Sequence, residues 1–171
     1  IWHRYPADAA KRIGEELLVN LNASPVHRGK HRERWQALAS RTTEQKIPMI
    51  YVNQVGGEDE LVFDGGSLAT IADGELAVVA PDFEEGCFEI RVERTVRGLE
   101  VVPGVTAATL SDVAAVWQAL VLGVRDYVEK NGFPGVVLGP SGGIDSAVTL
   151  AVAVDALGAD RVQAAMLPLK Y

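Results

Sequence analysis

The stretch from Gly135 to Ser146, which reads GVVLGPSGGIDS, constrains the fold of this chain most strongly. An apolar run rich in β-branched residues, Val136 to Leu138, is followed by small residues and then by a long apolar segment from Ile144. This order predicts a buried strand, a tight loop and a helix. The loop then lies at the carboxyl end of a strand and the amino end of a helix, where open α/β sheets bind their ligands.

The composition of this loop favours an anion as its ligand. A helix amino terminus presents unpaired N–H groups and a partial positive charge, and glycines let the backbone approach a phosphate closely. Ser141 and Ser146 add hydroxyl donors. Asp145 would repel a phosphate unless a cation lay between them, so we expect Mg²⁺ to bridge Asp145 and the phosphate oxygens.

The loop differs from two common nucleotide-binding motifs. No lysine stands at the helix start, as G-x-x-x-x-G-K-[ST] requires, and the glycines are not spaced as in G-x-G-x-x-G. The string SGGIDS instead resembles the pyrophosphate-binding loop of the ATP pyrophosphatases, which cleave ATP between its α- and β-phosphates. Pro140, which lacks an N–H, departs from that family's pattern. The resemblance implies an ATP site formed by Gly139, Pro140, Ser141, Gly142, Gly143, Ile144, Asp145 and Ser146.

Short periodic segments precede this loop and alternate with turn signals. Residues 6–13 and 31–41 have helical spacing, and Trp35, Leu38 and Ala39 form the expected inward face of the second helix. Strands are expected over residues 17–21, 49–55, 61–63, 67–71, 76–80 and 88–92, the first of them buried and the second ended by Gly56 and Gly57.

The second half of the chain follows a stretch without periodicity. Residues 94–105 contain a Pro-Gly pair and are typical of a linker. From Ser111, a good N-cap, apolar residues recur at helical spacing as far as Val128. A helix over residues 144–157 and a strand over residues 162–167 then predict a right-handed strand–helix–strand unit. We therefore expect a first domain over residues 1–98, a linker over 99–110 and a second domain over 111–171.

Two strings in the first half, ELLVNLNASPVHRGK and YVNQVGGEDELVFDGGS, resemble the carboxyl half of a nitrilase-type amidase domain. In that superfamily a cysteine, a lysine and a glutamate hydrolyse an amide through a thioester. The opening of the chain, IWHRYPADAAKRIGEELLVNLNASP, looks like the segment that follows the nucleophilic cysteine. On this resemblance the cysteine is expected just before Ile1 and the other two residues further upstream. The chain is therefore expected to be an internal fragment that is inactive by itself.

A nitrilase-type glutaminase joined to an SGGIDS ligase domain resembles one family, the glutamine-dependent NAD synthetases. That family hydrolyses glutamine, passes ammonia to its second domain and amidates adenylated deamido-NAD, forming NAD, AMP and pyrophosphate. The resemblance implies that Ser24 and Lys30 contact glutamine, that Asp145 binds Mg²⁺ and that the deamido-NAD contacts lie beyond Tyr171. The implied fold is α/β, with the carboxyl-terminal half of a nitrilase-like αββα sandwich followed by the start of a Rossmann-like parallel ATP pyrophosphatase domain.

Composition narrows the classes of partner. A net charge of −7 argues against non-specific nucleic-acid binding, and no apolar run is long enough to span a bilayer. Cys87 is the single cysteine, which excludes an internal disulfide framework. We expect small-molecule partners, namely glutamine, ATP and deamido-NAD, together with a cytoplasmic location and a homo-oligomer in the full-length protein.

Simpler alternatives stay open for several residues and for the function. Ser24 is also an ordinary turn residue, and Lys30 belongs to a basic cluster typical of a solvated helix face. His27 and His31 are expected at the surface, because no carboxylate or cysteine completes a metal site with them. For the function, the alternatives are another adenylating amidotransferase of the ATP pyrophosphatase type or a noncatalytic fragment.

Overall fold

The computed structural model describes residues 3 and 5–166, and the chain divides into two compact units. Unit 1 comprises Ile1–Val55 and Phe63–Asp112, and unit 2 comprises Gly56–Val62 and Val113–Tyr171. The elements of unit 1 are α1 (Tyr5–Arg12), β1 (Leu18–Asn22), α2 (Lys30–Gln45), β2 (Met49–Asn53), β5 (Leu68–Thr70), β6 (Leu76–Val79), β7 (Val92–Thr95) and β8 (Gly98–Val101). The remaining elements are β3 (Val55–Glu58), β4 (Leu61–Asp64), α3 (Asp112–Lys130), β9 (Val136–Leu138), α4 (Ile144–Leu157), the 3₁₀ turn η1 (Ala159–Arg161) and β10 (Val162–Ala164).

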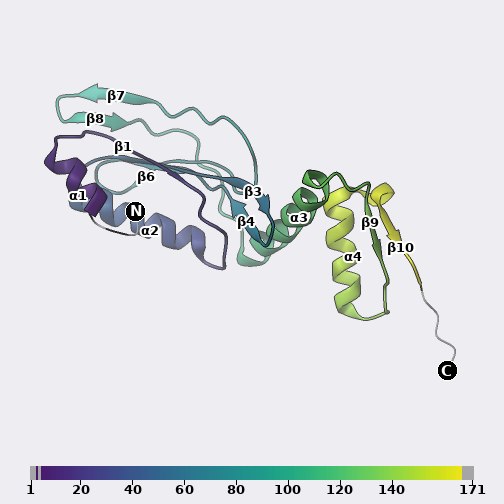
Figure 1. The fold of residues 1–171 in the computed structure, drawn as a ribbon. Coiled ribbons are helices and arrows are strands. Elements are labelled where there is room, and N and C mark those ends of the chain that lie inside the picture. The colour runs from purple at the N-terminus through teal and green to yellow at the C-terminus, as the bar shows by residue number, and fades with distance from the viewer. Residues whose placement is uncertain (1–2, 4, 167–171) are drawn as a thin grey trace. The chain divides into compact units, whose positions relative to one another are not determined.

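A four-stranded sheet in the order β1-β2-β5-β6 organises unit 1 (Figure 1). β1 and β2 are parallel, with Leu18 opposite Met49, and the other neighbouring strands are antiparallel. The helices α1 and α2 cover one face, where Ala7, Leu38 and Tyr51 belong to one buried cluster. Because β1 and β2 run in the same direction, their carboxyl ends meet at one edge of the sheet.

The opposite face of this sheet is only partly covered. The β7–β8 hairpin packs on it, and Val78 and Val101 lie in a second buried cluster there. At β1 the same face is open, since Val19 and Leu21 are 59% and 75% exposed. The prediction of a buried strand near residues 17–21 is therefore wrong for this row of side chains. Period-2 alternation points the row away from the helices, where no described residue covers it.

The helix α2 turns a different face inward from the one predicted. Its buried residues, Arg34, Leu38 and Thr42, are spaced by four along the helix. Leu38 is inside as predicted, Ala39 is half-buried, and Trp35 is 43% exposed rather than inside. The apolar pattern misled the prediction because two of the three inward positions carry polar side chains, which helical periodicity normally assigns to solvent.

Residues 92–101 form an antiparallel hairpin rather than the expected irregular linker. The pairing runs from Val92 opposite Val101 to Thr95 opposite Gly98. The turn needs a glycine, since Gly98 has a φ of 112°. The expected linker over residues 99–110 thus begins inside β8, and the strand expected over residues 88–92 lies further along the chain. The sequence pattern did not predict these strands because β7 reads VERT, in which charged residues interrupt the apolar alternation.

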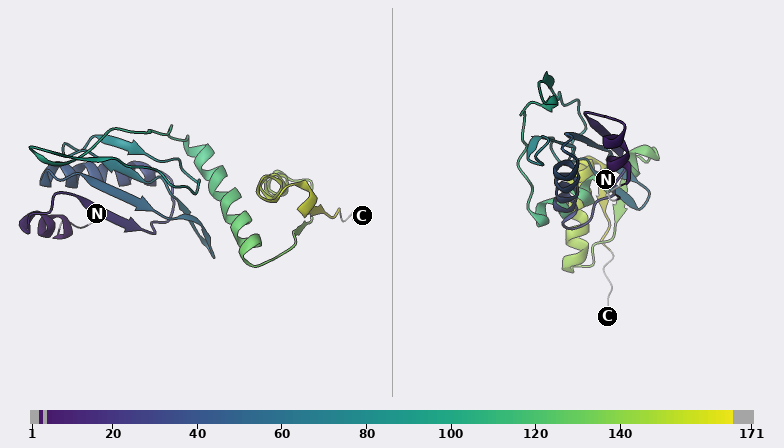
Figure 2. Two further views of the ribbon diagram at one scale, coloured as in Figure 1. Left: turned by 90° about the horizontal axis from the view of Figure 1, so that it is seen from above. Right: turned by 90° about the vertical axis from the view of Figure 1, so that its left-hand side faces the viewer.

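Unit 2 contains the predicted strand–helix–strand order. β9 and β10 are parallel, with Val136 opposite Val162, and α4 lies between them in the chain and packs against β10 (Figures 1 and 2). The helix expected over residues 144–157 is confirmed at both ends. Val137 is 68% exposed, so the organising strand is not buried as predicted. The predicted end of β10 at Leu167 lies outside the described residues.

The strands β3 and β4 form a hairpin that contacts α3 within unit 2. The Gly57 N–H donates to Asp126 Oδ2 over 2.7 Å, and Lys130 Nζ donates to the Gly57 carbonyl over 2.5 Å. A Cβ on Gly57 would lie 3.2 Å from the Gly123 Cα, so the close approach favours glycine. The strand expected over residues 49–55 ends at Asn53, and the separate strand β3 runs through Gly56 and Gly57, where the sequence predicted a break. None of the described helices has both the length and the apolar character needed to cross a membrane.

Candidate functional site

The predicted anion-binding loop joins β9 to α4 and is exposed. Gly142 has a φ of 83°, a conformation that favours glycine. Gly143 stands at the N-cap of α4 with an extended backbone, and no side chain caps this end of the helix. The first N–H groups of a helix have no partner inside it. This end of α4 therefore offers a ligand uncapped donors together with the positive end of the helix dipole.

The hydroxyl of Ser146 is committed to the inside of the loop. It accepts a hydrogen bond from the Ser141 N–H over 3.2 Å and donates to the Gly143 carbonyl over 2.9 Å. The Ser141 hydroxyl lies 3.3 Å from it. Sequence reasoning treated both serines as donors for the ligand. In the structure Ser146 instead ties the two ends of the glycine pair together, which fixes the curvature of the loop.

Asp145 lies in the first turn of α4 and is exposed. Within the described part of the chain, no group of three or more histidine, cysteine, aspartate or glutamate side chains could hold a metal ion. Mg²⁺ keeps several waters and is commonly bound by one or two carboxylates together with substrate phosphates. A single exposed carboxylate beside an uncapped helix end fits that mode of binding.

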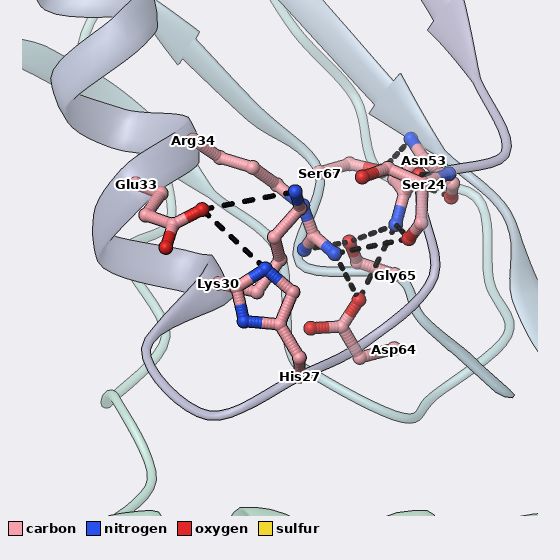
Figure 3. A network of polar contacts seen from close by, with 9 residues as sticks. All are labelled: Ser24, His27, Lys30, Glu33, Arg34, Asn53, Asp64, Gly65 and Ser67. Carbon is pink, nitrogen blue, oxygen red and sulfur yellow. Dashed lines mark hydrogen bonds and ion pairs between the residues drawn. The ribbon is translucent and has the colours of Figure 1, made fainter.

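Ser24, the first residue predicted to contact glutamine, lies just after the carboxyl end of β1 and is only 9% exposed. Its N–H donates to Asn53 Oδ1 over 2.9 Å (Figure 3). Its carbonyl accepts from Arg34 Nη2 over 3.1 Å and from Asn53 Nδ2 over 3.3 Å. Ser24 is therefore more than an exposed turn residue, because its peptide is held by side chains of β2 and α2.

Arg34 and Asp64 form the centre of this network. Arg34 is fully buried, and its Nη2 lies 2.5 Å from Asp64 Oδ1. Arg34 Nη1 also donates to the Gly65 carbonyl over 3.3 Å. Asn53 Nδ2 lies 3.1 Å from the same carbonyl and 3.3 Å from Asp64 Oδ1. A buried charge is tolerated when it is paired and hydrogen-bonded, as both charges are here.

Lys30, the second residue predicted to contact glutamine, is the first residue of α2 and follows Gly29, whose φ is 79°. Its side chain is 15% exposed and its Nζ lies 3.8 Å from Glu33 Oε2. The same oxygen lies 3.4 Å from His27 Nε2 (Figure 3). The basic cluster is therefore not one uniform solvated face, because the Arg28 side chain is 79% exposed while Lys30 is largely covered.

Sequence reasoning missed most of the buried polar groups around Ser24. His31, expected at the surface, is half-buried and acts electrostatically on Asp82. Burial raises the pKa of Asp82, and the interaction with His31 opposes this rise. Burial also raises the pKa of Tyr51, and the nearby Arg34 opposes that rise. Among the described residues, three buried side-chain atoms have no hydrogen-bond partner, namely Arg34 Nε, the Tyr51 hydroxyl and Asp82 Oδ1. The sequence contained one signal near these buried polar groups, the glycine pair Gly65 and Gly66 after a predicted strand.

Comparison with known families divides the chain into the same two halves that the motifs suggest. Residues 2–100 match the profile of the carbon-nitrogen hydrolase family, and residues 116–171 match that of NAD synthase. Proteins named glutamine-dependent NAD(+) synthetase from Acinetobacter baylyi and Rhodobacter capsulatus are each 43% identical to the chain. The matches span 100% and 99% of the chain but 31% of each relative. The resemblance stated from the sequence is thereby confirmed.

A solved structure supports the same similarity. The glutamine-dependent NAD+ synthetase from Acinetobacter baumannii in complex with adenosine diphosphate matches with a TM-score of 0.93 and 42% identity. The match covers 99% of this chain and 32% of that protein. The expectation of a mixed α/β chain with a nitrilase-like and an NAD synthase part is therefore confirmed.

Proposed function

The chain belongs to the carbon-nitrogen hydrolase family, and from this membership we propose that it is part of a glutamine-dependent NAD synthetase. The full-length protein hydrolyses glutamine and uses the ammonia and ATP to amidate deamido-NAD. One observation carries the proposal: relatives of that name are similar across both halves, in the same order, at 43% identity. The chain spans 31% of their length, so the activity belongs to the longer protein.

The loop Gly139 to Ser146 is the proposed site for the phosphates of ATP. The uncapped amino end of α4 and the positive φ of Gly142 support this assignment. Asp145 is the proposed ligand of Mg²⁺, which when bound neutralises charge between the carboxylate and the phosphate oxygens. Pro140 supplies no N–H, so the donors at this site come from the residues after it. The Ser146 hydroxyl shapes the loop, as its bonds to Ser141 and Gly143 indicate.

Ser24 and Lys30 are the proposed glutamine contacts of the first half. Lys30 pairs with the α-carboxylate of glutamine, and Ser24 hydrogen-bonds a polar end of the substrate. The limited exposure of both residues supports this role, because a largely covered ammonium gains more from a carboxylate partner than a solvated one. The nucleophilic cysteine is proposed to lie in the longer protein, outside these 171 residues.

The finer architecture is also part of the proposal. Unit 1 is one layer pair of an αββα sandwich, and the open apolar row of Val19 and Leu21 supports a second sheet packing there. The parallel β9–α4–β10 order supports a Rossmann-like start of the ATP-binding domain. The proposed linker between the first domain (1–98) and the second (111–171) covers residues 99–110. A cytoplasmic location and a homo-oligomeric full-length protein stay predictions from the sequence.

The proposal is tested with the full-length protein that contains this chain. We expect NAD, AMP and pyrophosphate from deamido-NAD, ATP and Mg²⁺, with either glutamine or ammonia as nitrogen donor. Absence of NAD with both donors would contradict the proposal. If pyrophosphate is released with a different acceptor instead, the second candidate holds, an adenylating amidotransferase of another substrate class. The SGGIDS loop alone is compatible with that candidate, whereas the carbon-nitrogen hydrolase half disfavours it.

A further inference from the structure

Ser24 is held in place through its backbone, by two side chains from other elements. The Asn53 side chain of β2 pairs with both backbone groups of Ser24, as a neighbouring strand does. Its Oδ1 accepts from the Ser24 N–H, and its Nδ2 donates to the Ser24 carbonyl. Arg34 of α2 donates to the same carbonyl over 3.1 Å. None of these bonds uses the Ser24 hydroxyl; the Ser24 side chain lies beside the Tyr51 hydroxyl, whose pKa burial raises and Ser24 helps to lower.

The two holding side chains are themselves fixed. Arg34 is fully buried and bound to Asp64 and to the Gly65 carbonyl. The Asn53 side chain shares these two acceptors, at 3.3 and 3.1 Å. A side chain locked by buried polar partners can hold a neighbour more accurately than a solvated one can.

The chain around Ser24 has little order of its own. Residues 23–27 lie between β1 and α2 and form no regular hydrogen-bonded element. Pro25 confines Ser24 to extended conformations and gives no N–H for a local turn bond. The position of the Ser24 peptide is therefore set by the bonds from Asn53 and Arg34, and its side chain also interacts with Tyr51.

We infer that Asn53 and Arg34 are positioning residues for glutamine, acting through the Ser24 peptide; this rests on the proposed glutamine site at Ser24. Both residues touch the backbone of Ser24 and direct its hydroxyl toward the substrate. Loss of either one lets Ser24 sample other orientations, which weakens substrate binding in the ground state and the transition state alike. Such a change raises KM and leaves kcat nearly unaltered.

The test measures glutamine-dependent and ammonia-dependent NAD formation by the full-length protein. Asn53→Ala is expected to raise the KM for glutamine about tenfold, with kcat and the ammonia-dependent rate nearly unchanged. In a Ser24→Ala background the same substitution should change KM no further, because its effect passes through Ser24. Arg34→Lys, which keeps a charge opposite Asp64 but loses the guanidinium fork, should raise KM less.

Thr42→Val is the matched control. It removes a buried 2.9 Å hydrogen bond between Thr42 and Thr70 on the same helix and sheet, without touching Ser24. It should lower stability while the KM for glutamine stays the same. If Asn53→Ala does not fold, Arg34→Lys and its combination with Ser24→Ala carry the test.

The outcomes separate this inference from the proposed function. Three results would overturn the inference: an unchanged KM for glutamine in Asn53→Ala, an equal rise of that KM with and without the Ser24 hydroxyl, or a parallel fall of the glutamine- and ammonia-dependent activities. The glutamine site itself would still hold if Ser24→Ala raised the KM for glutamine. An unchanged KM in Ser24→Ala would overturn the glutamine site and the inference together.

Discussion

Arg34 and Asp64 form an ion pair that is almost completely removed from solvent, with side-chain exposures of 0% and 5% and a distance of 2.5 Å between Nη2 and Oδ1. The pair joins α2 to the end of β4 and supports the peptide of Ser24. Removing one partner of such a pair leaves a buried charge without compensation. The pair is therefore a point at which unit 1 is sensitive to substitution.

The first prediction concerns this pair. Asp64→Asn should lower the free energy of unfolding by roughly 3–5 kcal/mol, because the Arg34 guanidinium stays buried without its counter-charge. Lys46→Gln breaks the surface pair with Asp73, which has a distance of 3.0 Å and side chains 59% and 71% exposed, and should cost about 0–1 kcal/mol. Urea denaturation followed by tryptophan fluorescence measures both. Equal losses in the two variants would contradict the prediction.

The second prediction compares two glycines in the left-handed region. Gly74 has a φ of 88°, and a Cβ there would lie 2.5 Å from Thr43 Oγ1 and 2.9 Å from the Ala39 carbonyl oxygen. Gly14 has a φ of 84° with nothing within 4 Å. Both alanine variants should lose about 1–2 kcal/mol to backbone strain, and Gly74→Ala a further 1–3 kcal/mol to overpacking. Thermal unfolding that ranks Gly14→Ala as the less stable variant would refute this.

The third prediction concerns pH. Burial raises the pKa of Asp82 above its ordinary value of 3.8, so the folded state holds this proton more tightly than the unfolded state. The resulting stabilisation is present below pH 3.8 and is lost as the pH rises through the folded pKa. Asp82→Asn cannot lose a proton, so its stability relative to the wild type should increase as the pH rises from about 4.

Urea midpoints of wild type and Asp82→Asn between pH 4 and 7 provide the measurement. The groups that act on Asp82 are His31 and Arg34, which oppose the rise of its pKa, and Asp64, which adds to it. Curves that run parallel over the whole range would show that Asp82 does not titrate differently in the two states.

The fourth prediction concerns the loop before α4. Asp145→Asn in the full-length protein should weaken Mg²⁺-dependent binding of ATP by about tenfold or more, equivalent to about 1.4 kcal/mol. The reason is that the amide cannot replace the charge of the proposed Mg²⁺ ligand. Asp160→Asn is a control of equal charge change, since Asp160 follows the carboxyl end of α4. Calorimetric titration with ATP, with and without Mg²⁺, measures the affinity of both variants. An equal affinity for ATP in Asp145→Asn and Asp160→Asn would count against the assignment.

The sequence predicted the loop-bearing half better than the network around Ser24. The helix over residues 144–157 was readable because small residues before Ile144 and Gly158 after Leu157 mark its ends. The residues that hold Ser24, Arg34 and Asn53, could not be predicted from the sequence, because a buried arginine cannot be distinguished from a solvated one until its partner is known. Asp64 lies about 30 residues further along the chain than Arg34, and local periodicity carries no information on such a pair.

Exposure was the other property that the sequence predicted poorly. Trp35, Val19 and Val137 are apolar and were expected inside, yet each is more than 40% exposed in the described structure. Apolar periodicity indicates which row of side chains prefers burial, but not whether a covering layer lies within the same stretch of chain.

The proposed function requires that the full-length protein transfer the amide nitrogen of glutamine to deamido-NAD. The most direct measurement supplies glutamine labelled with ¹⁵N at the amide, together with ATP, Mg²⁺ and deamido-NAD, and analyses the product by mass spectrometry. We expect NAD that carries the label in its carboxamide, with AMP and pyrophosphate formed in equal amounts. Unlabelled or absent NAD, with glutamine left intact, would contradict it.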